Sequence, residues 1–279
     1  MRKGRAMNGK NRVKAAVYVL LAVICIISLF PYIWMMIGSF KERVDLFSIP
    51  PSLVFKPTLE NYIQAFIVKG FSRNLENSFI AAALSTAIAL LIGVPGAYGL
   101  SRSKMKGDGA LMILTLVIRM APPIIIAVPF YILVVNLKLL TTVIGIVLAH
   151  SVLTLPLLVW MMKNFFDTIP ADIEEAAIID GCSMAGAFLR VSLPLVLGGL
   201  SATVILCIIT SWNEYLLASV LTTFKTVTLP VAIPNLITSK GTAWGEICAI
   251  GTVVSLPIAV FTILVQKYLV KGMTMGAIK

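Results

Sequence analysis

Residues 163–194 read KNFFDTIPADIEEAAIIDGCSMAGAFLRVSLP, and they hold more acidic residues than any other segment of the chain. The stretch separates two long apolar runs, at residues 143–162 and 195–221. Residues on both sides of Gly181 favour helix, whereas glycine weakens a helix and suits a turn. The stretch therefore predicts two short helices joined at Gly181, a helix-turn-helix between two membrane spans.

The ends of these two short helices also carry sequence signals. Pro170 suits a first helical turn, and Asp172 with Glu175 three residues later has the spacing of a capping box. Ser183 can cap the second helix by accepting a hydrogen bond from a backbone N–H group. We expect Pro194 to redirect the chain into the apolar run that follows.

Six apolar runs are each long enough to cross a membrane as a helix, which takes about 20 residues for roughly 30 Å of hydrocarbon. They lie at residues 15–37, 77–100, 111–135, 143–162, 195–221 and 246–269. Helices are the expected form, because lipid offers the backbone no partners and the runs lack the alternation of a membrane barrel. We therefore predict an all-α polytopic membrane protein with six transmembrane helices in a single domain, residues 1–279.

The composition agrees with an integral membrane protein. Of 279 residues, 59% are hydrophobic and 13% are charged, and the mean hydropathy of +0.98 exceeds what a soluble domain tolerates on its surface. The net charge of +11 fits an anionic membrane surface better than nucleic acid. Four widely spaced cysteines and a single histidine, His150, argue against a disulfide framework and against a metal centre.

The distribution of basic residues predicts that both termini are cytoplasmic. With the amino terminus inside, the inner segments hold 14 Lys and Arg residues and the outer loops hold eight, as the positive-inside rule requires. Two loops are then long enough to carry a function, residues 38–76 on the outside and residues 163–194 on the inside.

The inner loop contains a spaced motif. Glu175-Ala176-Ala177 is followed after three residues by Gly181, and after nine more by Val191-Ser192-Leu193-Pro194. This pattern resembles the loop E-A-A, three residues, G, nine residues, I-x-L-P of permease subunits in bacterial ABC importers. Val191 in place of isoleucine is one methylene smaller and equally β-branched, so the departure is small.

The resemblance implies that the inner loop docks into a cleft of a separate ATP-binding subunit and passes its closure to the membrane helices. The residues implied for this ATPase-coupling site are Glu174, Glu175, Ala176, Ala177, Asp180, Gly181, Leu193 and Pro194. The chain lacks a phosphate-binding G-x-x-x-x-G-K-[ST] loop, since its one Gly-Lys pair is followed by Asn11. We therefore expect a non-catalytic subunit with no metal site and no cofactor, and with ATP and Mg²⁺ bound by partner ATPase subunits.

Further stretches, in the right order, resemble the carbohydrate-uptake branch of these importers, whose type member is the smaller permease of the maltose importer. They include Ser39-Phe40-Lys41, Pro57-Thr58-Leu59-Glu60-Asn61-Tyr62, Trp212-Asn213-Glu214-Tyr215 and Gly272 to Lys279. The implied assembly lies in the lipid of a bacterial inner membrane. It contains this chain, a homologous second permease subunit, two ATP-binding subunits and an external solute-binding protein. Sugar is the implied substrate, and glycerol phosphate, a polyol or another small solute is the alternative.

Polar residues inside the apolar runs are candidates for the translocation pathway, because an ionisable group in lipid is costly unless it is paired or faces a cavity. Trp212, Asn213 and Glu214 lie near the outer end of one run, and Arg119 lies eight residues into another. The alternatives are an interfacial anchor for Glu214 and a paired or snorkelling side chain for Arg119. His150 is interpreted as a hydrogen-bonded interior residue. An ion-coupled carrier using these groups would need more membrane acids and an internal repeat.

The run at residues 111–135 is expected to be kinked or broken. It contains Pro122, Pro123 and Pro129, and proline removes a backbone hydrogen bond and clashes with the preceding helical turn. Broken membrane helices commonly line a cavity, and a kink that serves packing alone is the alternative.

Overall fold

The computed structural model describes the backbone of residues 2–102, 107–239 and 241–275. Four of the basic residues counted above (Lys104, Lys106, Lys240 and Lys279) and the last four residues of the stretch from Gly272 lie outside the described residues. Contacts divide the chain into two compact units, where the sequence predicts one domain over residues 1–279. One unit is Met1–Lys69 with Leu236–Ser255, and the other is Gly70–Asn235 with Leu256–Lys279. Each unit is described by itself.

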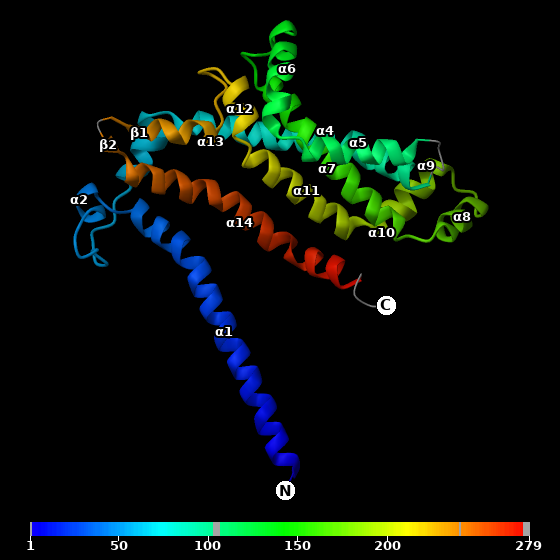
Figure 1. Ribbon diagram of the computed structural model, residues 1–279, viewed down its shortest axis with the longest axis horizontal. Coiled ribbons are helices and arrows are strands. Elements are labelled where there is room, and N and C mark those ends of the chain that lie inside the picture. Colours follow the sequence, from blue (N-terminus) through cyan, green and yellow to red (C-terminus); the bar gives the residue numbers. More distant parts are fainter. Residues whose placement is uncertain (1, 103–106, 240, 276–279) are drawn as a thin grey trace. The chain divides into compact units, whose positions relative to one another are not determined.

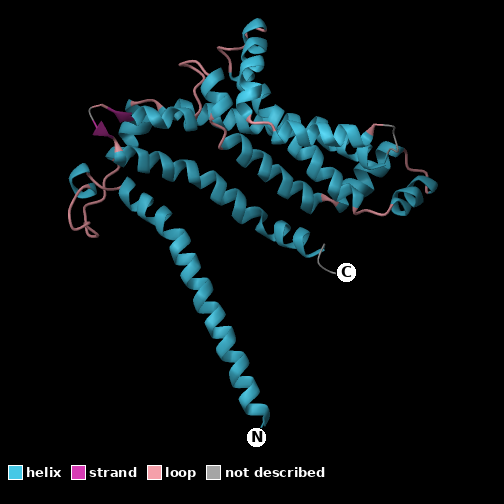
Figure 2. Cartoon of the chain, viewed as in Figure 1, coloured by secondary structure: helices cyan, strands magenta, loops and turns pink. Residues whose placement is uncertain are grey.

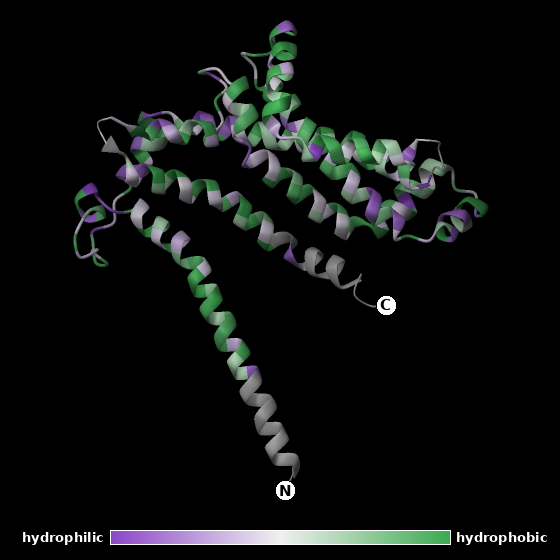
Figure 3. Ribbon diagram, viewed as in Figure 1, coloured by the Kyte–Doolittle hydropathy of each residue, from purple (hydrophilic) through white to green (hydrophobic). Residues whose placement is uncertain are grey.

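Helices form most of the described chain (Figure 2). Four of them are long and apolar enough to cross a membrane, and they include residues 14–39, 71–102, 143–167 and 244–263. Two bent helix pairs bring the number to six if each pair is one span. Apolar residues follow these helices over most of their lengths (Figure 3). The predicted all-α membrane fold is confirmed.

The first unit contains a long amino-terminal helix and the loop that follows it. Its elements are α1 (Arg2–Ser39), α2 (Arg43–Leu46), α3 (Glu60–Tyr62), a π-helix (Ile63–Val68), the antiparallel strands β1 (Ile237–Thr238) and β2 (Gly241–Thr242), and the first part of α14 (Trp244–Met275). The side-chain amide of Asn61 donates hydrogen bonds to the carbonyl groups of Ser39, at 2.9 Å, and Lys41, at 2.8 Å. These bonds hold α3 against the end of α1.

The second unit is built around the close packing of α4 and α7, with α11 beside them (Figure 1). Its helices are α4 (Phe71–Arg102), α5 (Asp108–Met120), α6 (Pro123–Asn136), α7 (Val143–Asp167), α8 (Ala171–Ile179), α9 (Met184–Ala187), a π-helix (Phe188–Ser192), α10 (Leu193–Leu195), α11 (Leu197–Trp212), α12 (Leu216–Leu221), α13 (Leu229–Ala232) and a 3₁₀ turn (Ile233–Leu236). Small residues on α4 allow this packing: a Cβ at Gly93 would lie 2.7 Å from the Leu158 side chain of α7.

Two of the predicted apolar runs are not straight helices. The run at residues 111–135 breaks between α5 and α6 with a bend of 97°, and the break lies at Pro122–Pro123 as the sequence predicts. The run at residues 195–221 differs from the expectation, because α11 ends at Trp212 and α12 begins only at Leu216. Helix α7 also continues to Asp167, five residues into the predicted inner loop.

Candidate functional site

The predicted helix-turn-helix is present, and we call residues 171–195 the hairpin. Helix α8 ends at Ile179. The turn follows at Gly181, whose φ of +93° is a left-handed conformation that favours glycine. Ser183 caps α9, since its Oγ accepts a hydrogen bond from the Gly186 N–H at 3.2 Å. The predicted capping box is wrong. Pro170 occupies the N-cap position of α8 without a side-chain hydrogen bond, which places Asp172 inside the first turn instead of at the cap.

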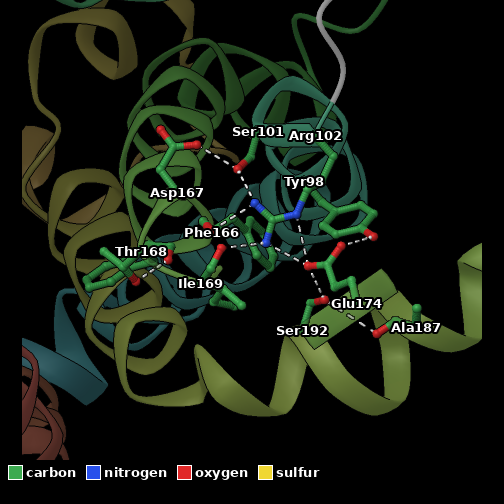
Figure 4. Close-up of polar contacts among 11 residues, drawn as sticks. Tyr98, Ser101, Arg102, Phe166, Asp167, Thr168, Ile169, Glu174, Ala187 and Ser192 are labelled. Atoms are coloured by element: carbon green, nitrogen blue, oxygen red, sulfur yellow. Dashed lines mark hydrogen bonds and ion pairs between the residues drawn. The ribbon is translucent and has the colours of Figure 1, made fainter. Parts of the chain in front are cut away.

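Glu174 of α8 is buried and accepts hydrogen bonds from three side chains (Figure 4). Arg102, the last residue of α4, donates to its Oε1 from Nε at 2.9 Å and from Nη2 at 2.6 Å. Ser192 donates to the same oxygen at 2.6 Å, and the Tyr98 hydroxyl donates to Oε2 at 2.8 Å. The two charged side chains are 15% and 7% exposed, so solvent screens their attraction little.

Arg102 also joins the carboxyl end of α7. Its Nη1 donates to the Phe166 carbonyl and its Nη2 to the Ile169 carbonyl, both at 3.2 Å (Figure 4). A cation at this position is favourable, because the last carbonyl groups of a helix carry partial negative charge and lack intrahelical partners. Nη1 further donates to Ser101, whose hydroxyl donates to Asp167 at 2.6 Å.

The surroundings of Glu174 determine its charge state. Burial raises the pKa of its carboxyl group, but the hydrogen bonds from Arg102, Ser192 and Tyr98 and the charge of Arg102 outweigh that effect. The pKa therefore lies below the ordinary value for glutamate, and the group is ionised at neutral pH.

The other residues of the predicted ATPase-coupling site lie apart from this buried cluster. Those with exposed positions are Glu175, Ala176, Asp180, Gly181 and Pro194, and those that are half-buried are Ala177 and Leu193. Glu174 is the one fully buried member of the predicted set, so its side chain is engaged within the chain, and Leu193 packs in part against the apolar core.

Three large apolar side chains stand exposed around the Gly181 turn. We call this set the hairpin tip, and its members are Ile178 (44% exposed), Ile179 (84%) and Met184 (69%). Gly181 has no atom within 4 Å of the place where a Cβ would lie, so the turn itself is open. Exposed apolar side chains that are rimmed by charge, here by Glu175 and Asp180, are typical of a protein-binding surface.

A second polar cluster surrounds Glu214 between α11 and α12. The Glu214 carboxylate accepts hydrogen bonds from the N–H groups of Leu217, at 2.8 Å, and Ala218, at 2.9 Å, and thereby caps α12. His150 of α7 places its Nε2 3.4 Å from Glu214 Oε2 and its Nδ1 2.6 Å from Ser211 Oγ. The interpretation of His150 as a hydrogen-bonded interior residue is confirmed.

The other candidate pathway residues have different surroundings. Trp212 is buried beside Glu214, whereas Asn213 is exposed. Arg119 is exposed on α5, and no hydrogen bond or ion pair of its side chain is found among the described residues. Among the described residues, the structure therefore brings Glu214 together with His150, and no polar contact joins Trp212, Asn213 or Arg119 to that cluster.

Sequence reasoning missed Arg102, Tyr98 and Ser192 as partners of Glu174. Arg102 counts in the sequence only as one basic residue at the inner end of a span. Its separation of 72 residues from Glu174 gives no local spacing signal. The available signal is the presence of a basic residue and an acidic loop at the same predicted membrane face.

Comparisons with known proteins place these features in context. The family model described as "Binding-protein-dependent transport system inner membrane component" matches residues 88–275. The chain is 37% identical over 257 residues to the probable ABC transporter permease protein y4oR of Sinorhizobium fredii, with 92% of each chain covered. It is 34% identical to the trehalose/maltose transport system permease protein MalG of Thermococcus litoralis, with 94% of each chain covered. A solved structure of a bacterial ABC transporter involved in import of the acidic polysaccharide alginate has a similar fold, with a TM-score of 0.74 at 24% identity over 93% of this chain and 97% of that chain.

Proposed function

Since the chain belongs to the family of binding-protein-dependent transport system inner membrane components, we propose that it is a permease subunit of an ATP-driven sugar importer. It forms half of the translocation pathway across a bacterial inner membrane. The hairpin couples this pathway to a separate ATP-binding subunit, which supplies the hydrolysis. Membership of this family argues against the ion-coupled carrier.

The exposed hairpin tip is the observation that carries the docking role. The basic residues of the sequence predict that the hairpin faces the cytoplasm, where lipid does not cover Ile179 and Met184. Water contact of these side chains is unfavourable, and burial in a partner's cleft removes it. Glu175 and Asp180 lie beside them in the sequence, and the small, exposed Ala176 leaves room for a partner to approach closely.

The remaining subunits follow from the same proposal. Two ATP-binding subunits hold ATP and Mg²⁺, a homologous permease completes the pathway, and an external solute-binding protein delivers the substrate. Both termini lie in the cytoplasm. The similarity to the trehalose/maltose permease of Thermococcus litoralis supports a sugar as the substrate, and glycerol phosphate or a polyol is the alternative.

The substitution Ile179→Asp tests the docking role. A carboxylate buried in an apolar cleft without a partner loses several kcal/mol, so we expect co-purification with the ATP-binding subunit to fall by about tenfold or more. The matched control is Val54→Asp, at a 93% exposed position in the outer loop, and it should co-purify normally. Unchanged co-purification and transport in the inserted Ile179→Asp protein would contradict the docking role.

A further inference from the structure

Within the described part of the chain, one residue of the hairpin makes side-chain hydrogen bonds to the helices that the hairpin lies against. Among the residues that the structure describes, every side-chain hydrogen bond from residues 171–195 to α4 or α7 ends on Glu174. The other hydrogen bonds of the hairpin stay within it, such as those of Ser183 and the bond from Ser192 to Glu174. Glu174 is therefore the point at which side-chain hydrogen bonding fixes the hairpin to α4.

The Glu174 carboxylate reaches three transmembrane elements at once. Arg102 connects it directly to α4 and, through the carbonyl groups of Phe166 and Ile169, to the end of α7. Ser192 connects it to the second arm of the hairpin, which continues through α10 into α11. Figure 4 shows these groups converging around the Arg102 guanidinium.

Aromatic packing also holds the hairpin at this position, but it fixes the position less precisely than the hydrogen bonds do. The ring centroids of Tyr98 and Phe188 are 4.7 Å apart, and those of Tyr98 and Phe166 are 5.4 Å apart. Apolar contact is largely non-directional, so these rings tolerate small shifts of the hairpin. The Arg102 guanidinium does not tolerate such shifts, because its N–H donors have a fixed planar geometry and all five of them are used here.

From this geometry we propose that Arg102 and Glu174 are positioning residues that form a rigid joint, through which displacement of the hairpin moves α4, α7 and α11 together. The joint lies behind the docking surface and makes no contact with the ATP-binding subunit. This inference rests on the proposed function, because the displacement comes from the docked partner. It gives Glu174 and its neighbour Glu175 different tasks, transmission for the buried carboxylate and docking for the exposed one.

The substitution Glu174→Gln tests the joint in the complete transporter, reconstituted in liposomes with its solute-binding protein. It keeps the side-chain shape and the aromatic packing but removes the charge that orients Arg102. We expect normal co-purification with the ATP-binding subunit and continued ATP hydrolysis. Solute moved per ATP hydrolysed should fall by about tenfold, since a charged hydrogen bond changes an equilibrium by that order. A residue that only stabilises the fold would lower the amount of complex and leave this ratio unchanged.

Further variants make the result decisive. Arg102→Lys keeps the positive charge but loses the fork, and Ser192→Ala removes one bond to the carboxylate, so both should lower the ratio less than Glu174→Gln does. Asp172→Asn, an exposed carboxylate on the same helix, is the matched control and should keep the wild-type ratio. If Glu174→Gln does not accumulate, the ratio is measured in the other two variants.

Two results would overturn the joint. One is a wild-type ratio in every assembled variant, and the other is a loss of co-purification in Glu174→Gln, which would place Glu174 in the docking surface. Failure of the proposed function looks different, because the wild-type chain then binds no ATP-binding subunit. In that case hydrogen exchange of residues 171–195 tests the joint alone, and exchange no faster in Glu174→Gln than in the wild type would contradict it.

Discussion

Glu174 and Glu175 are adjacent, yet one is buried and the other exposed. Successive residues of a helix point about 100° apart, so one residue can face the protein core while its neighbour faces solvent. The sequence could not show which of the two faces inward, because the apolar residues of α8 (ADIEEAAII) do not gather on one side. The choice depends on Arg102, which is distant in the sequence and close only in the fold.

The lowered pKa of Glu174 predicts how pH affects the hairpin. A carboxyl group with a lower pKa in the folded state than in the unfolded state stabilises the fold above its ordinary pKa of 4.5, and this contribution is lost as pH falls through the folded-state value. We expect the difference in Tm between wild type and Glu174→Gln, in detergent, to stay constant from about pH 8 to about pH 5 and to shrink below that range. A difference that grows on acidification would contradict this assignment.

Removal of the Glu214 carboxylate should destabilise the second unit. Glu214→Ala leaves the N–H groups of Leu217 and Ala218 without their cap and removes the partner of His150. We expect a loss of about 1–3 kcal/mol in the free energy of unfolding. The exposed neighbour provides the control, as Asn213→Ala should change stability by no more than about 0.5 kcal/mol. Similar effects of the two substitutions in chemical unfolding would show that the cap is unimportant.

At the scale of helices, the close approach of α11 to α7 depends on Gly199. A Cβ there would lie 2.5 Å from the Phe165 ring, whereas one at Gly198 has no atom within 4 Å. Gly199→Ala should therefore lower the free energy of unfolding by about 1–3 kcal/mol through overpacking. Gly198→Ala should raise it by about 0.5–1 kcal/mol, because alanine is the better helix former. Thermal unfolding of the two variants checks this, and effects of the same sign would contradict the packing.

The elements that the sequence predicts best are those with local signals. Gly181 and Ser183 mark the turn and the second cap of the hairpin, and Pro122–Pro123 mark the break in the third apolar run. The sequence does not predict the break after Trp212, because apolar residues resume at Tyr215 and continue to Leu221, so the whole stretch reads as one run. The structure gives the reason for the break, since the Glu214 carboxylate caps the start of α12 there.

At the scale of the whole molecule, hydropathy predicts the apolar runs, and the spacing of the inner motif predicts the family. Neither can predict which surfaces are covered in the assembly, because that depends on other chains. Helix α1 is an example, because no part of its most apolar stretch is buried within the chain. Lipid or a partner subunit must cover such a helix in the membrane.

The most direct test of the central claim is purification of this chain from its native membrane in mild detergent, with mass spectrometry and an ATPase assay of the material that accompanies it. We predict recovery of a second permease, an ATP-binding subunit and ATPase activity. Isolation of the chain alone, with no ATPase activity but with transport driven by an ion gradient in liposomes, would contradict the assignment as an importer subunit.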